Sequence, residues 1–226
     1  MGIVIAIDGP AGAGKSSTAR EVARRLGFTY VDTGAMYRAV TYLVLQNKVD
    51  VRDEQAVIQL AAQADIQFQW QAGELHTYLN GKDVSREIRS AEVANLVSPI
   101  SAIGGVREIM VERQREMGRS SNIVMEGRDI GTRVFPGAEF KIYLDADVAT
   151  RAKRRLKDYE QIGQAIPLEQ IMAEIKHRDE IDSSRQHSPL KQAADAIVID
   201  TSNLSFEEQV AKIIALIRQK YPDNKD

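Results

Sequence analysis

A glycine-rich segment near the amino terminus constrains this 226-residue chain more than any other feature. It matches the pattern G-x-x-x-x-G-K-[ST] and, with the residue after it, comprises Gly9, Pro10, Ala11, Gly12, Ala13, Gly14, Lys15, Ser16 and Ser17. Glycines let the backbone curl so that successive N–H groups point at phosphate oxygens. An apolar stretch at residues 3–7 precedes the segment, and an amphipathic stretch at residues 16–26 follows it. The order strand, loop, helix predicts a nucleoside triphosphate site of the P-loop type.

The residue types in the loop indicate how it would hold a triphosphate. We expect Lys15 to reach the β- and γ-phosphates and the Ser16 hydroxyl to sit on Mg²⁺. The start of the following helix adds the partial positive charge of its amino-terminal end. The loop lacks the third glycine of a dinucleotide-binding fingerprint, which excludes that alternative. ATP and Mg²⁺ are therefore the expected phosphoryl donor and metal ion.

Short β-branched segments alternate with amphipathic helical segments along most of the chain. The expected strands are nearly continuous apolar runs, as in strands buried on both faces, and lie at residues 3–7, 28–31, 123–125, 140–144 and 196–199. This alternation predicts an α/β fold with a doubly wound, five-stranded parallel sheet. Residues 60–90 break the pattern, because residues 66–70 and 75–79 alternate with a period of two and Asn80-Gly81 favours a tight turn. We expect a small antiparallel insertion there.

The composition excludes several functional classes. Thirty Lys and Arg residues against 32 Asp and Glu leave a net charge of −2, so no broad attraction to nucleic acid or anionic membrane is expected. The absence of cysteine excludes disulfides, thiolate metal sites and a cysteine nucleophile. We expect neither a targeting segment nor a membrane span, and therefore a cytoplasmic protein. No long apolar face calls for a partner, so we expect a monomer.

Polar residues follow the expected strands at the edge where open α/β sheets bind ligands. Arg128 and Asp129 lie side by side after residues 123–125, and Gly127 and Gly131 enclose the pair. Such a tight loop would hold a guanidinium and a carboxylate in fixed orientation. Other expected strands also end in acidic residues, namely Asp8, Asp32 and Asp145.

A second group of charged residues lies in the helical segment near residues 168–186. Arg178, Asp182 and Arg185 are spaced by four and three, which puts them on one helix face. A salt-bridged surface helix is the alternative explanation. Together with the basic stretch at residues 148–160, the pattern favours a lid that neutralises phosphate, because ATP and a nucleoside monophosphate together bring about six negative charges.

These motifs, in this order, resemble those of the bacterial cytidylate kinases, within the nucleoside monophosphate kinases. The resemblance is carried by the glycine-rich loop, by DTGAMYR at residues 32–38, and by residues 92–95, 127–136 and 178–185. It covers nearly the whole chain, and Arg133 departs from it where an apolar residue is expected. It implies one P-loop kinase domain over residues 1–226, with a core at about 1–59, 91–147 and 187–226, a nucleotide-binding insertion at about 60–90 and a helical lid at about 148–186.

The resemblance also implies an activity and a role for each site residue. The expected reaction is ATP-dependent phosphorylation of CMP and dCMP to CDP and dCDP. The implied holders of the acceptor phosphate are Arg38 and Arg128, with Arg185 assisting. The implied cytosine readers are Ser98, Arg107 and Asp129, while the ribose contacts are Arg178 and Asp182. Thr33 joins the substrate set, and Glu126 joins Ser16 at the metal. The implied lid residues that close over ATP are Arg151, Arg154 and Arg155. The catalytic set is Lys15, Arg128 and Arg185.

Two alternatives remain at this point. The chain could be a kinase for another small acceptor, such as UMP, AMP or shikimate. It could also be a GTPase-type switch, because residues 47–50 spell the guanine-reading pattern N-K-x-D. That tetrapeptide lies at an expected helix end about thirty residues past the loop, where a coincidental match is the better explanation.

Overall fold

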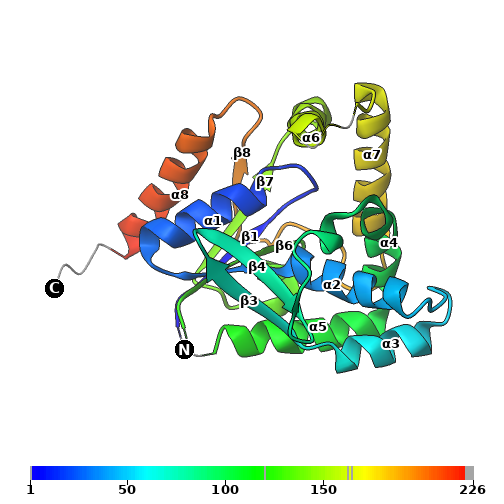
Figure 1. Cartoon of the computed structure of the whole chain (residues 1–226). Coiled ribbons are helices and arrows are strands. Elements are labelled where there is room, and N and C mark those ends of the chain that lie inside the picture. Colours follow the sequence, from blue (N-terminus) through cyan, green and yellow to red (C-terminus); the bar gives the residue numbers. More distant parts are fainter. Residues whose placement is uncertain (1, 120, 162, 164, 222–226) are drawn as a thin grey trace.

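The five predicted parallel strands form one sheet in the order β2-β6-β1-β7-β8 (Figure 1). The computed structural model describes residues 2–119, 121–161, 163 and 165–221. The strand bounds are β1 Val4–Asp8, β2 Thr29–Asp32, β6 Ile123–Gly127, β7 Phe140–Asp145 and β8 Ile197–Asp200. The chain first builds the β2 and β6 side of β1 and then crosses to the β7 and β8 side. The carboxyl end of β1, where the glycine-rich loop begins, is therefore the switch point at which such sheets bind ligands.

Helices cover both faces of the sheet, which confirms the doubly wound prediction. All five residues of β1 are buried, and successive side chains point to opposite faces. Ile5 and Ile7 pack with α1 (Lys15–Leu26) and α8 (Phe206–Lys220). Val4 and Ala6 pack toward α5 (Gly104–Met117) and the short helix η2 (Ile130–Val134). Figure 1 shows α1 and α8 together, with α5 at a distance from both.

A second apolar core lies among the helices beside β2. It joins α2 (Thr33–Gln46), α3 (Glu54–Gln63), α4 (Ala91–Ala102) and α5, and the turn η1 (Glu87–Arg89) also contributes. Asp32 begins α2 by accepting a hydrogen bond from the Ala35 N–H at 2.8 Å. The tetrapeptide at residues 47–50 starts at the carboxyl-terminal end of α2, as the sequence indicated.

The predicted antiparallel insertion is a three-stranded sheet of β3 (Ile66–Gln71), β4 (Glu74–Leu79) and β5 (Lys82–Asp83). Asn80 and Gly81 both have positive φ and form the turn between β4 and β5. The turn between β3 and β4 uses Ala72 and Gly73, also at positive φ. The sequence did not indicate this second turn, because alanine rarely adopts a left-handed conformation.

The helices α6 (Val148–Gln161) and α7 (Leu168–Ser184) pack on each other around a small apolar cluster of their own. Ala152, Ile171 and Ile175 form its buried centre. The predicted division into core, insertion and lid is consistent with these bounds and stays a prediction; its last residues, 222–226, lie outside the described part of the chain. Among the described residues, no helix has the length and apolar character needed to cross a membrane.

Gly9 provides a direct test of the glycine-rich loop. Its φ is +148°, and a Cβ atom there would lie 2.0 Å from the Leu144 carbonyl oxygen. We expect Gly9→Ala to lower the free energy of unfolding by about 1–3 kcal/mol and to weaken ATP binding, because the loop must shift. Denaturant unfolding and nucleotide titration measure the two effects. Gly137→Ala is the control, since its Cβ would meet no atom within 4 Å. Equal stability of the two variants would contradict the prediction.

Candidate nucleotide site

The glycine-rich loop curls between β1 and α1 and encloses Lys15. The Lys15 side chain is buried, and its Nζ donates to the Pro10 carbonyl oxygen at 2.7 Å. Burial, together with the charges of Arg128 and Arg178, lowers the pKa of Lys15 to about 7, against the opposing charge of Glu126. The ammonium therefore lies in a poorly hydrated, cation-rich environment that negatively charged phosphates would relieve.

Glu126, Asp32 and Ser16 form a hard-oxygen set beside Lys15. β2 and β6 are in register at Asp32 and Glu126, so the two carboxylates lie on neighbouring strands. The Ser16 side chain hydrogen bonds to Glu126, and burial together with the charge of Asp32 raises the pKa of Glu126. Oxygen donors of this kind fit Mg²⁺, which binds through one or two carboxylates plus phosphate oxygens. Within the described residues, no group of three or more His, Cys, Asp or Glu side chains offers an all-protein metal cage.

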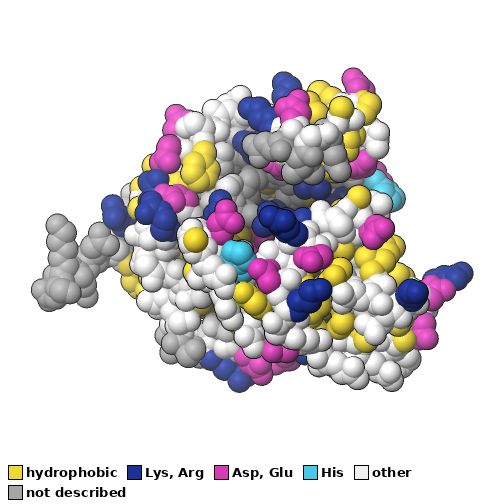
Figure 2. All heavy atoms as spheres, in the orientation of Figure 1, with side chains coloured by type: hydrophobic (Ala, Val, Ile, Leu, Met, Phe, Trp, Pro, Cys, Tyr) yellow, Lys and Arg dark blue, Asp and Glu magenta, His cyan; other side chains and the backbone are white. Residues whose placement is uncertain are grey.

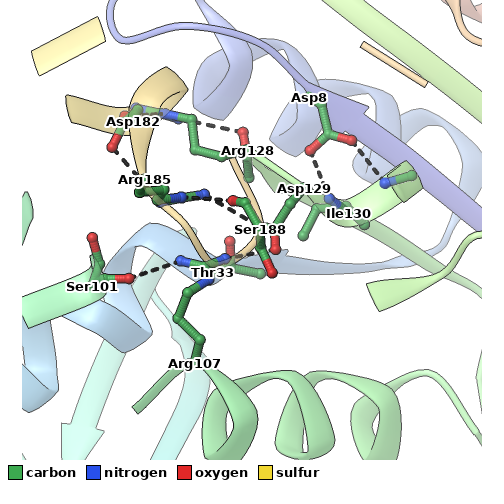
Figure 3. A network of polar contacts seen from close by, with 12 residues as sticks. Asp8, Thr33, Ser101, Arg107, Arg128, Asp129, Ile130, Asp182, Arg185 and Ser188 are labelled. Carbon is green, nitrogen blue, oxygen red and sulfur yellow. Dashed lines mark hydrogen bonds and ion pairs between the residues drawn. The ribbon is translucent and has the colours of Figure 1, made fainter. Parts of the chain in front are cut away.

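The loop after β6 brings Arg128 and Asp129 into contact with partners from distant parts of the chain (Figure 3). Arg128 Nε donates to Asp182 Oδ2 of α7 at 2.9 Å. Asp129 is buried, and its Oδ2 accepts from Arg107 Nη2 of α5 at 2.6 Å. The predicted tight loop thus joins two helices that are far apart in sequence.

The three predicted cytosine readers lie in one region. Arg107 donates to the Ser101 carbonyl oxygen at 3.0 Å as well as to Asp129, and its guanidinium lies over the Tyr37 ring at 5.2 Å. Ser98 is buried on α4, one turn before Ser101. The structure brings Arg107 and Asp129 into direct contact and holds both rigidly in a poorly hydrated environment.

The predicted charged face of α7 points toward Arg128 and Asp129 of the loop after β6. Asp182 contacts Arg128, and Arg185 lies 3.7 Å from Asp182 and 3.9 Å from Asp129. Burial raises the pKa of Asp182, but Arg128, Arg178 and Arg185 outweigh this effect and hold the pKa below its usual range. Burial and the charge of Arg128 lower the pKa of Arg178 to about 10. The charged face of α7 is therefore part of a buried ion-pair network, and the alternative of a salt-bridged surface helix is wrong.

Arg38, on α2, is a further cation near Arg178. Its Nη2 donates to Asp32 Oδ2 at 3.0 Å, and its charge acts on Arg178. Thr33, the first residue of α2, donates its hydroxyl to the Glu126 carbonyl oxygen at 2.7 Å. Its hydroxyl therefore fixes β6 to α2.

The three predicted lid arginines of α6 have different partners. Arg151 is buried and donates to the Ala11 carbonyl oxygen at 3.0 Å and to Asp179 of α7 at 2.6 Å. Arg154 donates to Thr201 beyond β8, while Arg155 lies over the ring of Tyr159. Figure 2 shows a hollow beneath the lobe that holds α6 and α7, with Lys and Arg side chains along it.

Several buried guanidinium atoms have no hydrogen-bond partner among the described residues. They are Nε of Arg38, Arg107 and Arg178, Nη2 of Arg185 and Nη1 of Arg113. Buried donors are almost always paired, so unpaired ones call for an explanation. Four of these five atoms belong to residues predicted to bind the acceptor, and Arg113 is the exception. A ligand with several acceptor oxygens would supply the missing partners.

Some residues of the site were not in the predicted set. Asp8 and Asp179 hold other site residues in place, Tyr37 lies under Arg107, and Thr201 contacts Arg154. Asp8 carried a signal, because it ends a strand directly before the loop. Arg133, which departs from the family pattern, is exposed, and its carbonyl oxygen accepts from Arg115.

Comparisons with known proteins agree with this geometry. A family model described as cytidylate kinase matches residues 5–219. A cytidylate kinase from Lactobacillus gasseri is 51% identical over 96% of this chain and 94% of its own length. The chain belongs to the cytidylate kinase family. A cytidylate kinase from Alkaliphilus oremlandii is 46% identical over 96% of this chain and 98% of its own. The predicted family and enzyme class are confirmed, and neither the kinases for other acceptors nor the GTPase-type switch is favoured.

A solved structure supports the fold alone. The shikimate kinase from Acinetobacter baumannii superimposes with a TM-score of 0.51 at 14% identity, covering 99% of this chain and 97% of its own. The predicted P-loop α/β fold is confirmed by the sheet order and by this likeness.

The buried pair of Arg107 and Asp129 gives a thermodynamic prediction. Asp129→Ala leaves the Arg107 charge buried without its partner, so we expect the free energy of unfolding to fall by about 3–5 kcal/mol. The double variant Arg107→Met/Asp129→Ala should regain at least about 1 kcal/mol, because the uncompensated charge is gone. Denaturant unfolding of the wild type, both single variants and the double variant measures the coupling. Strictly additive losses would contradict the prediction.

Proposed function

We propose that the protein transfers the γ-phosphoryl group of ATP to CMP and dCMP, yielding ADP with CDP or dCDP. The observation that carries the proposal is the convergence of donor and acceptor elements at one edge of the sheet. Lys15 begins α1 after the loop that follows β1, and Arg128 directly follows the adjacent strand β6. The charge of Arg128 acts on Lys15. A phosphate bound to each would lie close to the other.

The acceptor phosphate would be held by Arg38 and Arg128, with Arg185 assisting. Arginine suits this task because its planar fork can bind two phosphate oxygens at once. Arg38 and Arg185 each have an unpaired buried N–H, and Arg128 is aligned by Asp182. These features support a multidentate phosphate site between α2, the loop after β6, and α7.

Cytosine would be read by Ser98, Arg107 and Asp129. Asp129 Oδ2 accepts from Arg107, whereas Oδ1 lies 3.9 Å from Arg185, beyond hydrogen-bonding distance. A carboxylate oxygen can accept from the N4 amino group of cytosine, and an arginine can donate to O2 or N3. Uracil carries a carbonyl oxygen on C4 in place of the amino group, so it cannot donate a hydrogen bond to the carboxylate.

The ribose would lie beside Arg178 and Asp182 on α7. Asp182 stays ionised because three arginines surround it, and an ionised carboxylate accepts a hydrogen bond from a hydroxyl. Both residues lie one helical turn apart on the face that meets Arg128. A sugar between the base readers and the phosphate holders would contact this face.

ATP would bind through the glycine-rich loop, with Lys15 on the β- and γ-phosphates. Ser16 and Glu126 would hold Mg²⁺, which would neutralise phosphate charge. Arg151, Arg154 and Arg155 would close over the triphosphate from α6. The Arg151 contacts with Ala11 and Asp179 support this role, since they already tie α6 and α7 to the loop.

The chemistry requires no general base. The second pKa of a phosphate monoester is about 6, so the attacking oxygen is already ionised at neutral pH. The protein's contribution is in-line positioning and neutralisation of the charge spread over the transferred group, for which Lys15, Arg128 and Arg185 are arranged. The monomeric state stays a prediction. Cytoplasmic localisation stays a prediction.

An acceptor panel tests the proposed function. With ATP and Mg²⁺, coupled measurement of ADP release should give the highest turnover with CMP and dCMP. UMP should be poorer by about 10- to 100-fold in kcat/KM, because its C4 carbonyl oxygen cannot donate a hydrogen bond to the buried Asp129 carboxylate. AMP and shikimate are the further comparisons. Faster turnover of UMP, AMP or shikimate than of CMP would overturn the assignment.

Asp182 tests the ribose assignment. Asp182→Ala should reduce kcat/KM for CMP more than for dCMP, because only CMP offers the 2′-hydroxyl as well as the 3′-hydroxyl. A difference of about 3- to 10-fold between the two losses corresponds to one hydrogen bond. Glu180→Ala, at an exposed position of the same helix, is the matched control. Equal losses on CMP and dCMP would remove Asp182 from hydroxyl recognition.

A further inference from the structure

Asp8 is a buried carboxylate for which the proposed reaction has no direct use. It is the last residue of β1, directly before Gly9, and it is 5% exposed. Its Oδ1 accepts from the Ile130 N–H at 2.9 Å, and its Oδ2 accepts from the Gly131 N–H at 2.8 Å. Figure 3 shows these two bonds beside Asp129. Both carboxylate oxygens therefore accept hydrogen bonds from consecutive backbone N–H groups of the loop after β6.

Those two N–H groups immediately follow the base-reading residue. Asp129 precedes η2 with φ −145° and ψ 24°, and the peptide groups after it are the ones that Asp8 holds. Because a side chain leaves its backbone in a direction set by φ and ψ, this clamp determines where the Asp129 carboxylate points. Gly131 also fits the clamp closely, since a Cβ there would lie 3.4 Å from Asp8 Oδ2 and 3.2 Å from the Lys141 side chain.

The clamp is costly in electrostatic terms. Burial, together with the nearby charge of Asp129, raises the pKa of Asp8 to about 6 despite the two backbone hydrogen bonds. Two carboxylates near each other in a poorly hydrated interior destabilise the fold. A neutral side chain could cap a turn without this cost. The carboxylate differs from such a cap in accepting from two N–H groups at once, which fixes the orientation of the loop.

We infer that Asp8 is a positioning residue for cytosine recognition: it holds the Arg128–Asp129 loop in register with the glycine-rich loop. Its place between the two loops makes it a direct physical link between the donor and acceptor sites. The inference rests on the proposed function, because it concerns how the same acceptor site discriminates bases.

Asp8→Asn tests this inference with little change in shape. An amide has one acceptor oxygen, and its NH₂ group would face a backbone donor, so one of the two clamping bonds is lost. We expect KM for CMP to rise about tenfold and the CMP to UMP ratio of kcat/KM to fall about tenfold. KM for ATP should change by less than about threefold, because the glycine-rich loop keeps its own backbone geometry.

The same measurements in an Asp129→Ala background separate positioning from general destabilisation. If Asp8 acts through Asp129, Asp8→Asn should leave the CMP to UMP ratio of that background unchanged. Asp53→Asn is the matched control, since Asp53 also caps a backbone N–H, that of Ala56, at the start of α3. It should alter neither KM nor the ratio. If Asp8→Asn does not fold, Asp8→Ser carries the same measurements with a smaller neutral group.

The outcomes distinguish the inference from the function on which it rests. Wild-type protein that fails to prefer CMP overturns the proposed function itself. Wild-type protein that prefers CMP, together with a folded Asp8 variant of unchanged KM and unchanged ratio, overturns only the inference. A lower melting temperature with unchanged KM and ratio shows a purely structural role and also overturns it.

Discussion

The site depends on holding many cations close together at one edge of a sheet. Lys15, Arg38, Arg128, Arg178 and Arg185 come from four different elements and face a common region. Their mutual repulsion and burial lower the pKa of Lys15 to about 7 and that of Arg178 to about 10. Such a cluster is unfavourable by itself, and phosphate groups are the ligands whose charge would compensate it.

A matched set of carboxylates makes this arrangement possible. Asp32 orients Arg38, Asp129 orients Arg107, Asp182 orients Arg128, and Asp179 orients Arg151. Each pair fixes a guanidinium in one direction, while other N–H groups of Arg38, Arg107 and Arg185 remain unpaired. The carboxylates therefore give geometry without cancelling the attraction for phosphate, which suits catalysis by preorganised charge.

The scaffold gives these pairs their rigidity. β1, β6 and β2 are parallel and in register, so Asp8, Gly127, Glu126 and Asp32 end at neighbouring points. Apolar residues buried on both faces of the sheet fix the positions of those ends. Asp8, at the end of β1, fixes the loop after β6 by accepting two backbone hydrogen bonds from it. The lobe of α6 and α7 has its own small core, and Asp182 and Arg151 connect it to the site through polar contacts. Such an interface can change its packing at lower cost than an apolar core.

The sequence by itself determined the local features. Residues close together in the chain determine the glycine-rich loop, the five strands and the charged face of α7, because local geometry and hydrophobic period decide these features. The tertiary structure alone decided which groups meet. Arg128 pairs with Asp182 across 54 positions, and Ile130 bonds to Asp8 across 122. Such contacts depend on strand order and on how the loops close, and neither is encoded in short-range pattern. The sequence marks Asp8 as a strand end, but its role and those of Tyr37 and Asp179 became recognisable only with those contacts, because each acts through a residue that is distant in the chain.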